Sequence, residues 1–398
     1  MTEGLFTQTH QRGPVRDQVG SRAWLQAMLD AEAALAVACA EAGVVPADAA
    51  QAISAACADV GAYDERELGI LAVRTGNPVV GLVAAILAAI PKEFAAQVHR
   101  GATSQDIVDT AAMLVVSRGI SALITDLDGC ADVAARLAEQ HRDTPMIART
   151  LLQQAVPITF GLKAAQWLHG LGAVRVHLLD VRGRLPAQLG GAAGSLHGYP
   201  DAATGLQIAE VFAARLGLAA ARTPWHTLRY PIGDVAGGLA TTAGILGKIA
   251  LDLVLLAQNE VAEITMALDR RGGSSTMAHK RNPVAAVAAR SAAKRAPGLA
   301  ATLFAAMEQE HERAAGAWHA EWLTLSDLLT CVGSAAAWLY DALESVRVNE
   351  HEMARNLAAL GPAASPDGGA ALIDRALADY RGTKDDSKQP TRDNEGTN

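Results

Sequence analysis

The sequence is poor in aromatic residues, which make up 4% of its 398 positions, although half of the residues are apolar. A sizeable core must therefore be built from alanine, leucine and valine, and this composition favours closely packed helices over sheets. The length is enough for two or three domains, or for one long helical body with small flanking domains. We expect an all-α protein.

Cysteine is also scarce, and its spacing excludes the usual cysteine sites. No C-x-x-C pair occurs, and the four cysteines lie among apolar residues: Cys39, Cys57, Cys130 and Cys331. This pattern is typical of buried free thiols. We therefore expect no disulfide framework, no metal site and no cofactor.

The chain lacks a basic run, and its formal net charge is −8. Nucleic acid is therefore not expected as a partner, and an anionic substrate would need local cations. The N-terminus has neither the basic nor the apolar segment of a secretory signal. The most apolar long segment, residues 245–268, is interrupted by polar residues, which argues against a membrane span; among them are Lys248, Asp252, Asn259 and Glu263. We expect a soluble, cytoplasmic protein.

Turn and capping signals divide the chain into long helices. Ser21 is a plausible N-cap for a helix that ends near Gly43. Longer helices are predicted over residues 111–140, 157–184, 230–268, 283–309 and 320–346. Within 245–268, Lys248, Asp252, Asn259 and Glu263 fall on one narrow stripe, as in the core of a helical bundle. Helices with so little polar surface usually pack against other subunits as well, which predicts a homo-oligomer.

These elements give a domain division by sequence order. We predict an N-terminal helical domain over residues 1–108 and a central helical bundle over 109–346, with a catalytic loop at 270–284. A short C-terminal helical region follows at 347–380. Residues 381–398 contain no apolar side chain and are expected to be disordered.

The segment from Arg270 to Val284, R-R-G-G-S-S-T-M-A-H-K-R-N-P-V, is the best candidate for a catalytic loop. Adjacent glycine, serine and threonine residues disfavour a helix. A glycine hinge that carries hydroxyls, with the Lys280 cation and the Asn282 amide nearby, is typical of a closing catalytic loop. The alternative is a serine- and glycine-rich linker with chance charges.

Two further loops contain polar or glycine-rich patterns. In H-R-G-A-T-S-Q-D-I-V-D-T, from His99 to Thr110, hydroxyls stand beside a helix start, where exposed N–H groups can bind a carboxylate. An ordinary capped turn is the alternative. The segment from Leu185 to Pro200 has four glycines but no P-loop lysine. We interpret it as a tight crossover between helices that can contribute to the site.

The run G-S-S-T-M-A-H-K-R-N-P resembles the signature of the fumarase/aspartase superfamily, usually G-S-S-x-M-P-x-K-x-N-P, with Ala278 in place of the proline. The segment Thr103–Asp106 matches its T-S-x-D region, and residues 149–160 match its second region. The resemblance implies a long helical bundle and a homotetramer. It also implies that the three regions, on different helix ends, meet only across subunits.

This chain departs from the pattern where many members carry a charged pair. Leu151 and Gln154 stand at the two histidine positions of R-T-H-x-x-H, and Val287 stands where some members have a glutamate. The histidine is the usual acid that protonates an amine or hydroxide leaving group, which is strongly basic. A carboxylate, whose parent acid has a pKa near ~4, departs unaided. The paired absence therefore favours a carboxylate as leaving group or, in reverse, as nucleophile.

Three further segments, residues 152–168, 223–229 and 310–322, resemble the bacterial 3-carboxy-cis,cis-muconate cycloisomerases. This resemblance implies interconversion of 3-carboxy-cis,cis-muconate, a tricarboxylate, and 4-carboxymuconolactone in protocatechuate catabolism. Two alternatives stay open. One is an adenylosuccinate- or argininosuccinate-type lyase that releases fumarate, and the other is a catalytically silent protein on the same scaffold.

The resemblance also implies roles for individual residues. Ser274 would transfer the proton, and Lys280 would stabilise its alkoxide. Lys280 and Asn282 would hold the carboxylate of the enolate. A second carboxylate would lie against Thr103, Ser104 and Gln105. The remaining candidates for substrate binding are His99, Gln154, Arg12, His226 and Arg229.

Overall fold

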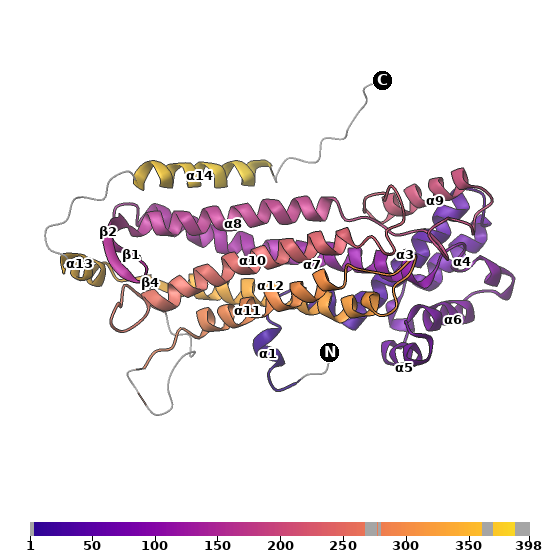
Figure 1. The fold of residues 1–398 in the computed structure, drawn as a ribbon, viewed down its shortest axis with the longest axis horizontal. Coiled ribbons are helices and arrows are strands. Elements are labelled where there is room, and N and C mark those ends of the chain that lie inside the picture. Colours follow the sequence, from indigo (N-terminus) through magenta and orange to yellow (C-terminus); the bar gives the residue numbers. More distant parts are fainter. Residues whose placement is uncertain (1–3, 267–276, 278–279, 360–368, 387–398) are drawn as a thin grey trace, which may run out of the picture. The chain divides into compact units, whose positions relative to one another are not determined.

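The computed structural model describes residues 4–266, 277, 280–359 and 369–386. Helices dominate this part of the chain, which confirms the all-α prediction, and two short two-stranded sheets accompany them (Figure 1). The helices are α1 (Thr7–His10), α2 (Val15–Val19), α3 (Ser21–Glu41), α4 (Ala47–Cys57), η1 (Val60–Ala62), α5 (Glu65–Thr75), α6 (Val79–Ala89), η2 (Lys92–Gln97), α7 (Ser104–Gln140), α8 (Phe160–Gly183), α9 (Ala202–Arg215), α10 (Tyr230–Leu256), α11 (Val284–Ala305), α12 (Ala317–Glu344), α13 (Glu350–Ala358) and α14 (Gly369–Asp386). The strands are β1 (Pro145–Thr150), β2 (Gln153–Thr159), β3 (Ile264–Met266) and β4 (Val346–Val348).

The chain forms two compact units, each assembled from three separate segments. Unit 1 comprises Met1–Leu123, Leu178–Ala240 and Arg295–Gly333. Unit 2 comprises Ile124–His177, Thr241–Lys294 and Ser334–Asn398. The domains expected from the sequence were consecutive segments, whereas each of these units combines segments that are distant in the chain. The expected domain boundaries stay a prediction.

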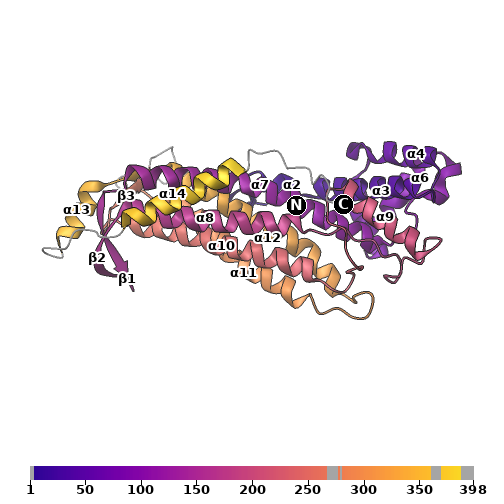
Figure 2. The same cartoon turned by 90° about the horizontal axis from the view of Figure 1, so that it is seen from above.

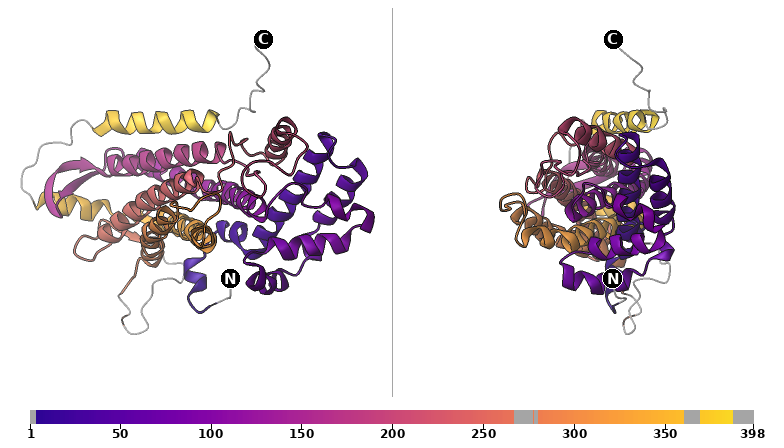
Figure 3. Two further views of the ribbon diagram at one scale, coloured as in Figure 1. Left: turned by 45° about the vertical axis from the view of Figure 1, so that its right-hand side comes forward. Right: turned by 90° about the vertical axis from the view of Figure 1, so that its right-hand side faces the viewer.

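Unit 1 is built around α3, whose buried face includes Leu25, Leu29 and Leu35. This helix packs against α4 and α9, and α5 packs against α6 (Figure 3). The predicted N-cap at Ser21 is wrong by one position, because Gly20 has the extended backbone of a cap and its carbonyl accepts from the N–H of Trp24. The α7 helix begins at Ser104, seven residues before the predicted start at residue 111.

Unit 2 contains the strands. β1 and β2 form an antiparallel hairpin, with Thr150 opposite Gln153, and α13 lies beside β1 (Figure 2). The predicted helix start at Pro157 is wrong, because this proline pairs with Ile147 in the hairpin and α8 begins at Phe160. Hairpin pairing thus takes precedence over a helical pattern in these residues.

The predicted helix over residues 230–268 is also too long, since α10 ends at Leu256. Ala262 has a positive φ of 50°, and the N–H of Glu263 donates back to the carbonyl of Leu256. The chain then continues as β3, which pairs with β4. Asn259 and Glu263 therefore do not share a helical stripe with Lys248 and Asp252.

The remaining predictions about the chain concern thiols, apolar helices and the C-terminus. All four cysteines are buried free thiols, as expected. By length and composition alone, α3, α7, α10 and α12 are apolar enough to cross a membrane, and 44–78% of their most apolar windows is buried within the protein. The tail expected to begin at residue 381 overlaps α14, which continues to Asp386. Residues 387–398 lie outside the described part of the chain.

Candidate active site

The first motif region lies at the N-terminus of α7, in unit 1. The N–H of Thr103 donates to Oδ2 of Asp106 at 2.9 Å, which is one half of a capping box. Thr103 and Ser104 are half-buried, and among the described residues their hydroxyls have no hydrogen-bond partner. Two available hydroxyls at a helix N-terminus form a suitable place for a carboxylate.

Asp106 joins this helix start to two distant loops. It is fully buried, and its carboxylate accepts from the N–H groups of Gly190 and Gly191, both at 2.9 Å. His226 places Nε2 at 2.7 Å from Oδ1 of the same carboxylate. A Cβ on Gly190 would lie 2.7 Å from Cβ of Pro224, so only glycine fits. The glycine-rich segment is therefore fastened to the first motif region.

Gln105, predicted to contact substrate, is completely buried in this structure. Its amide nitrogen donates to the carbonyl of His226 at 2.8 Å and to Asp109 at 3.1 Å, and its amide oxygen accepts from Arg313 at 2.8 Å. Gln105 directly follows the half-buried Thr103 and Ser104, but its own side chain points into the protein. Its surroundings favour a positioning role over the predicted contact with substrate.

Arg229 also differs from its predicted place as a substrate cation. It is 2% exposed and lies between two carboxylates, with Nη1 and Nη2 at 2.7 and 3.0 Å from Asp109 and Nε at 2.9 Å from Glu321. Nη2 also lies 2.5 Å from Glu321, and the guanidinium stacks on Trp225. Burial opposes the charged form, but Asp109 and Glu321 outweigh it and raise the pKa of Arg229. Its donors are already engaged inside unit 1.

His99 precedes the first motif region and remains a candidate for substrate binding. Its Nδ1 lies 2.6 Å from Oε1 of Glu32, and its side chain is 19% exposed. Burial lowers the pKa of His99, but the nearby Glu32 carboxylate more than compensates, so the pKa is raised. Arg12 lies in the turn between α1 and α2, and its role stays a prediction.

The second motif region is the β1–β2 hairpin of unit 2. Arg149 forms a bidentate pair with Glu263 at 2.9 and 2.8 Å, and the amide of Asn356 donates to the same carboxylate at 3.0 Å. Glu263 is fully buried directly before β3, which leads toward the signature loop. The pair therefore anchors the hairpin to the stem of that loop.

The hairpin tip presents apolar side chains where many superfamily members carry histidine. Leu151 and Leu152 occupy both central turn positions, with φ of 51° and 62°, and are 96% and 76% exposed. Positive φ is unfavourable for leucine, so the turn stores strain. Gln154 is exposed on β2, opposite Arg149. Val287, at the position of the partner glutamate, is 50% exposed on α11.

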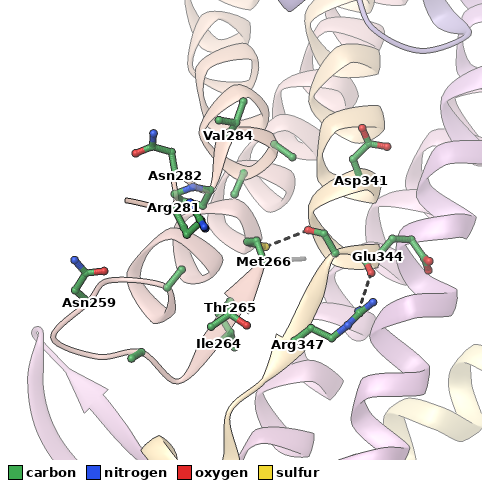
Figure 4. A pocket seen from close by; sticks show the side chains of 16 residues that line it. Asn259, Ile264, Thr265, Met266, Arg281, Asn282, Val284, Asp341, Glu344 and Arg347 are labelled. Atoms are coloured by element: carbon green, nitrogen blue, oxygen red, sulfur yellow. Dashed lines mark hydrogen bonds between the residues drawn. The ribbon is translucent and has the colours of Figure 1, made fainter. Parts of the chain in front are cut away.

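The signature loop is described only at its end. Ser274 lies outside the described residues. Lys280 is exposed, and its N–H donates to the carbonyl of Met277 at 3.0 Å. Asn282 lines a cavity of about 580 Å³ within unit 2, between β3, the start of α11, the end of α12 and β4 (Figure 4). Other polar side chains around this cavity are Asn259, Thr265, Arg281, Asp341, Glu344, Ser345 and Arg347.

The structure thus gathers the predicted residues into two groups. Thr103, Ser104 and His99 lie in unit 1, and Gln154, Lys280 and Asn282 lie in unit 2. Within the described part of the chain, no cluster of three His, Cys, Asp or Glu side chains is suited to a metal ion.

Three buried carboxylates that pair with basic side chains near the candidate site were not predicted from the sequence: Glu32, Asp109 and Glu263. Asp106 was expected as a member of the T-S-x-D region, but its contacts with the glycine-rich segment and His226 were not. The spacing of Thr103 and Asp106 marks a capping box, but no local signal marks the other three.

Comparison with known proteins defines the class. A family model described as lyase matches residues 6–298. The chain belongs to this lyase family, which is of the fumarase/aspartase type, and the earlier resemblance is confirmed. Its apolar helices are core helices of the soluble fold.

Individual relatives are similar to this chain over most of its length. A nitrosuccinate lyase of Streptomyces davaonensis is 45% identical over 369 residues, covering 89% of this chain and 77% of that protein. A 3-carboxy-cis,cis-muconate cycloisomerase of Bradyrhizobium diazoefficiens is 47% identical over 348 residues, covering 86% and 76%. The crystal structure of a 3-carboxy-cis,cis-muconate lactonizing enzyme from Pseudomonas putida matches with a TM-score of 0.82 at 37% identity, covering 96% of this chain and 88% of that one.

Proposed function

We propose that this enzyme is a cycloisomerase that interconverts 3-carboxy-cis,cis-muconate and 4-carboxymuconolactone in cytoplasmic aromatic catabolism. The observation that carries the proposal is the hairpin tip. Leu151, Leu152 and Gln154 supply neither an acid nor a base there, and Val287 supplies no partner. A reaction whose leaving group is a stable anion needs no acid at this place.

In the proposed reaction, one carboxylate oxygen of the substrate attacks the conjugated diene and forms the ring C–O bond. The displaced electron pair moves into the adjacent carboxylate as an enolate. Ser274 then donates its proton to the carbon next to that carboxylate, and Lys280 stabilises the resulting alkoxide. In the reverse direction the alkoxide removes this proton, and the ring carboxylate departs with the C–O electron pair.

The proposed site holds the other carboxylates of the substrate with separate groups. Lys280 and Asn282 bind the carboxylate that becomes the enolate. Thr103 and Ser104 bind a second at the N-terminus of α7, where their hydroxyls have no described partner. His99, four residues before Thr103, is the candidate basic side chain for the same carboxylate. We propose that these groups come together across the subunits of a homotetramer.

A nitrosuccinate-cleaving lyase is the second candidate, because the Streptomyces davaonensis relative named for that substrate is 45% identical over 89% of this chain. Nitrite is the anion of nitrous acid, which is similar in strength to a carboxylic acid, so its departure also requires no protonation. The hairpin tip is therefore compatible with either substrate. Fumarate release from adenylosuccinate or argininosuccinate is disfavoured, because their amine leaving groups require an acid.

The decisive assay supplies the purified enzyme with each substrate separately. Loss of the ultraviolet absorbance of 3-carboxymuconate supports the cycloisomerase. Release of nitrite from nitrosuccinate without turnover of the muconate overturns it in favour of the second candidate. Fumarate release from the amino-succinates alone would exclude both.

The Ser274→Ala variant tests the proton donor with whichever substrate is turned over. Removal of the hydroxyl should lower kcat by at least about 10²-fold, the usual contribution of a general acid or base. The circular dichroism spectrum and oligomeric state should match those of the parent. Activity within severalfold of the parent would remove Ser274 from the chemistry.

A further inference from the structure

His99 is held in an unusual backbone conformation directly before the first motif region. Its φ is 56°, in the left-handed region that few non-glycine residues adopt, and its carbonyl accepts from the N–H of Ala102 at 3.3 Å. It lies four residues before Thr103, between η2 and α7. Such strain persists where the surroundings determine the conformation, and it often marks a functional position.

Glu32, on α3, fixes one side of the imidazole ring. Its side chain is completely buried, and Oε1 lies 2.6 Å from Nδ1 of His99. The second oxygen, Oε2, is buried and has no hydrogen-bond partner among the described residues. A buried carboxylate with so few partners is costly unless a positive charge compensates it.

The other ionisable groups around this pair do not provide that compensation. Burial raises the pKa of Cys39 to about 11 and that of Cys57 to about 12, so both thiols are neutral near pH 7. Burial also raises the pKa of Tyr199, which stays neutral.

Two charged groups remain near the pair. Asp106 is the second acid that acts on His99, and its oxygens already accept four contacts. Arg100 follows His99 in the chain, but its side chain is exposed. His99 is therefore the basic side chain that directly contacts Glu32.

The opposite ring nitrogen of His99 is available to a ligand. No described residue forms a hydrogen bond with Nε2, and part of the side chain is exposed. A histidine whose Nδ1–H is held by a carboxylate presents Nε2 in a fixed direction. A doubly protonated ring presents an N–H there, which can donate to a carboxylate with the added strength of a charged hydrogen bond.

We propose that Glu32 is a positioning residue that keeps His99 as an imidazolium, whose Nε2–H binds a substrate carboxylate beside Thr103 and Ser104. This inference rests on the proposed function for the substrate contact. The charge state of His99 does not depend on any substrate. The two parts can therefore be tested separately.

The first experiment measures the protonation of His99 in the full-length enzyme by NMR with ¹³C-labelled histidine, using His99→Gln to assign the signal. In the parent, His99 should stay protonated well above the usual histidine pKa of about 6.5. In Glu32→Gln it should lose its proton at a lower pH than in the parent, since the larger of the two carboxylate effects that oppose burial is then removed. A parent His99 that titrates near 6.5, or an unchanged titration in the variant, would overturn the proposed role of Glu32.

The second experiment measures KM and kcat between pH 5.5 and 8 with the substrate that is turned over. KM of the parent should stay low to a higher pH than KM of Glu32→Gln. KM of Glu32→Gln should rise about tenfold as the ring loses its proton, equivalent to about 1.4 kcal/mol, with kcat within about twofold of the parent. Glu41→Gln removes an exposed carboxylate from the same helix and should behave like the parent.

A double-mutant cycle separates positioning from a merely structural effect. In the His99→Gln background, Glu32→Gln should change KM no further, because the group through which it acts is absent. If the two substitutions raise KM independently, or if Glu32→Gln leaves the pH profile of KM unchanged while the NMR shift is present, the substrate contact is wrong.

Discussion

Substitution of Arg229 by methionine tests the interpretation of the buried charge network. Methionine keeps much of the apolar volume but removes every N–H that binds Asp109 and Glu321. It also removes the cation that stacks on Trp225, 4.7 Å from the ring centre. If Arg229 is a structural residue, the main consequence should be a loss of folding stability.

The magnitude follows from the burial of all three charged groups. The side chains of Arg229, Asp109 and Glu321 are 0%, 2% and 3% exposed. Removing one member of such a network leaves uncompensated buried charge and typically costs about 3–5 kcal/mol. Asp109 keeps a hydrogen bond from Trp318 at 2.9 Å, and Glu321 keeps one from Gln309 at 2.9 Å. These bonds limit the loss without replacing the cation.

The loss should depend on pH. Burial already raises the pKa of Glu321, and removal of Arg229 raises it further. A carboxyl group with a higher pKa in the folded than in the unfolded protein lowers stability as pH rises through the folded-state pKa. The difference between parent and variant should therefore be largest near neutral pH and should shrink as pH falls toward 5.

Urea unfolding followed by tryptophan fluorescence measures the effect at pH 7.5 and pH 5.5, at one subunit concentration. Arg184→Met is the matched control, because Arg184 also contacts two aspartates in unit 1 but is 55% exposed. Its unfolding midpoint should stay close to that of the parent. Trp318→Phe removes a single bond to Asp109 and should cost about 1.5–3 kcal/mol, which keeps the test informative if Arg229→Met does not fold. Equal midpoints for Arg229→Met and Arg184→Met would refute the reasoning.

Two further predictions concern close packing and the hairpin anchor. Gly198→Ala should destabilise the protein by about 1–3 kcal/mol, because its Cβ would lie 2.5 Å from Cα of Gly101. Gly69→Ala, which has open space in α5, should stabilise the protein by about 0.5–1 kcal/mol. Equal shifts of the two variants in thermal unfolding would contradict this contrast. Glu263→Gln should lower folding stability by about 1–3 kcal/mol through loss of the Arg149 pair. The control is Glu344→Gln, which removes an exposed partner of Arg136. Indistinguishable urea midpoints of the two variants would show that the pair between Arg149 and Glu263 contributes nothing to stability.

Several features of the fold were predictable from sequence because they have local causes. The low aromatic content and the long apolar segments indicated helices, and the isolated cysteines indicated buried thiols. The boundaries failed where distant segments pair. Pro157 lies in a hairpin because Ile147 is opposite it, and α10 ends at Leu256 because β3 pairs with β4.

The candidate site shows the same division. The motif around Thr103 and Ser104 was recognised from the residues, and both hydroxyls are half-buried at a helix start. Gln105 and Arg229 belong to matching segments, but the structure turns both into the protein. A motif specifies which residues are present, and their direction depends on helix phase and on partners elsewhere in the chain.

The sequence by itself determined the family, the helical class and the absence of a histidine at the hairpin tip, since each of these follows from residue identity. Only the tertiary structure decided which polar groups face inward. Asp106 lies against the glycine-rich segment, Arg229 between two carboxylates and Glu32 against His99. These charges are buried together because each reduces the cost of removing the other from water, and no pattern of neighbouring residues can show that pairing.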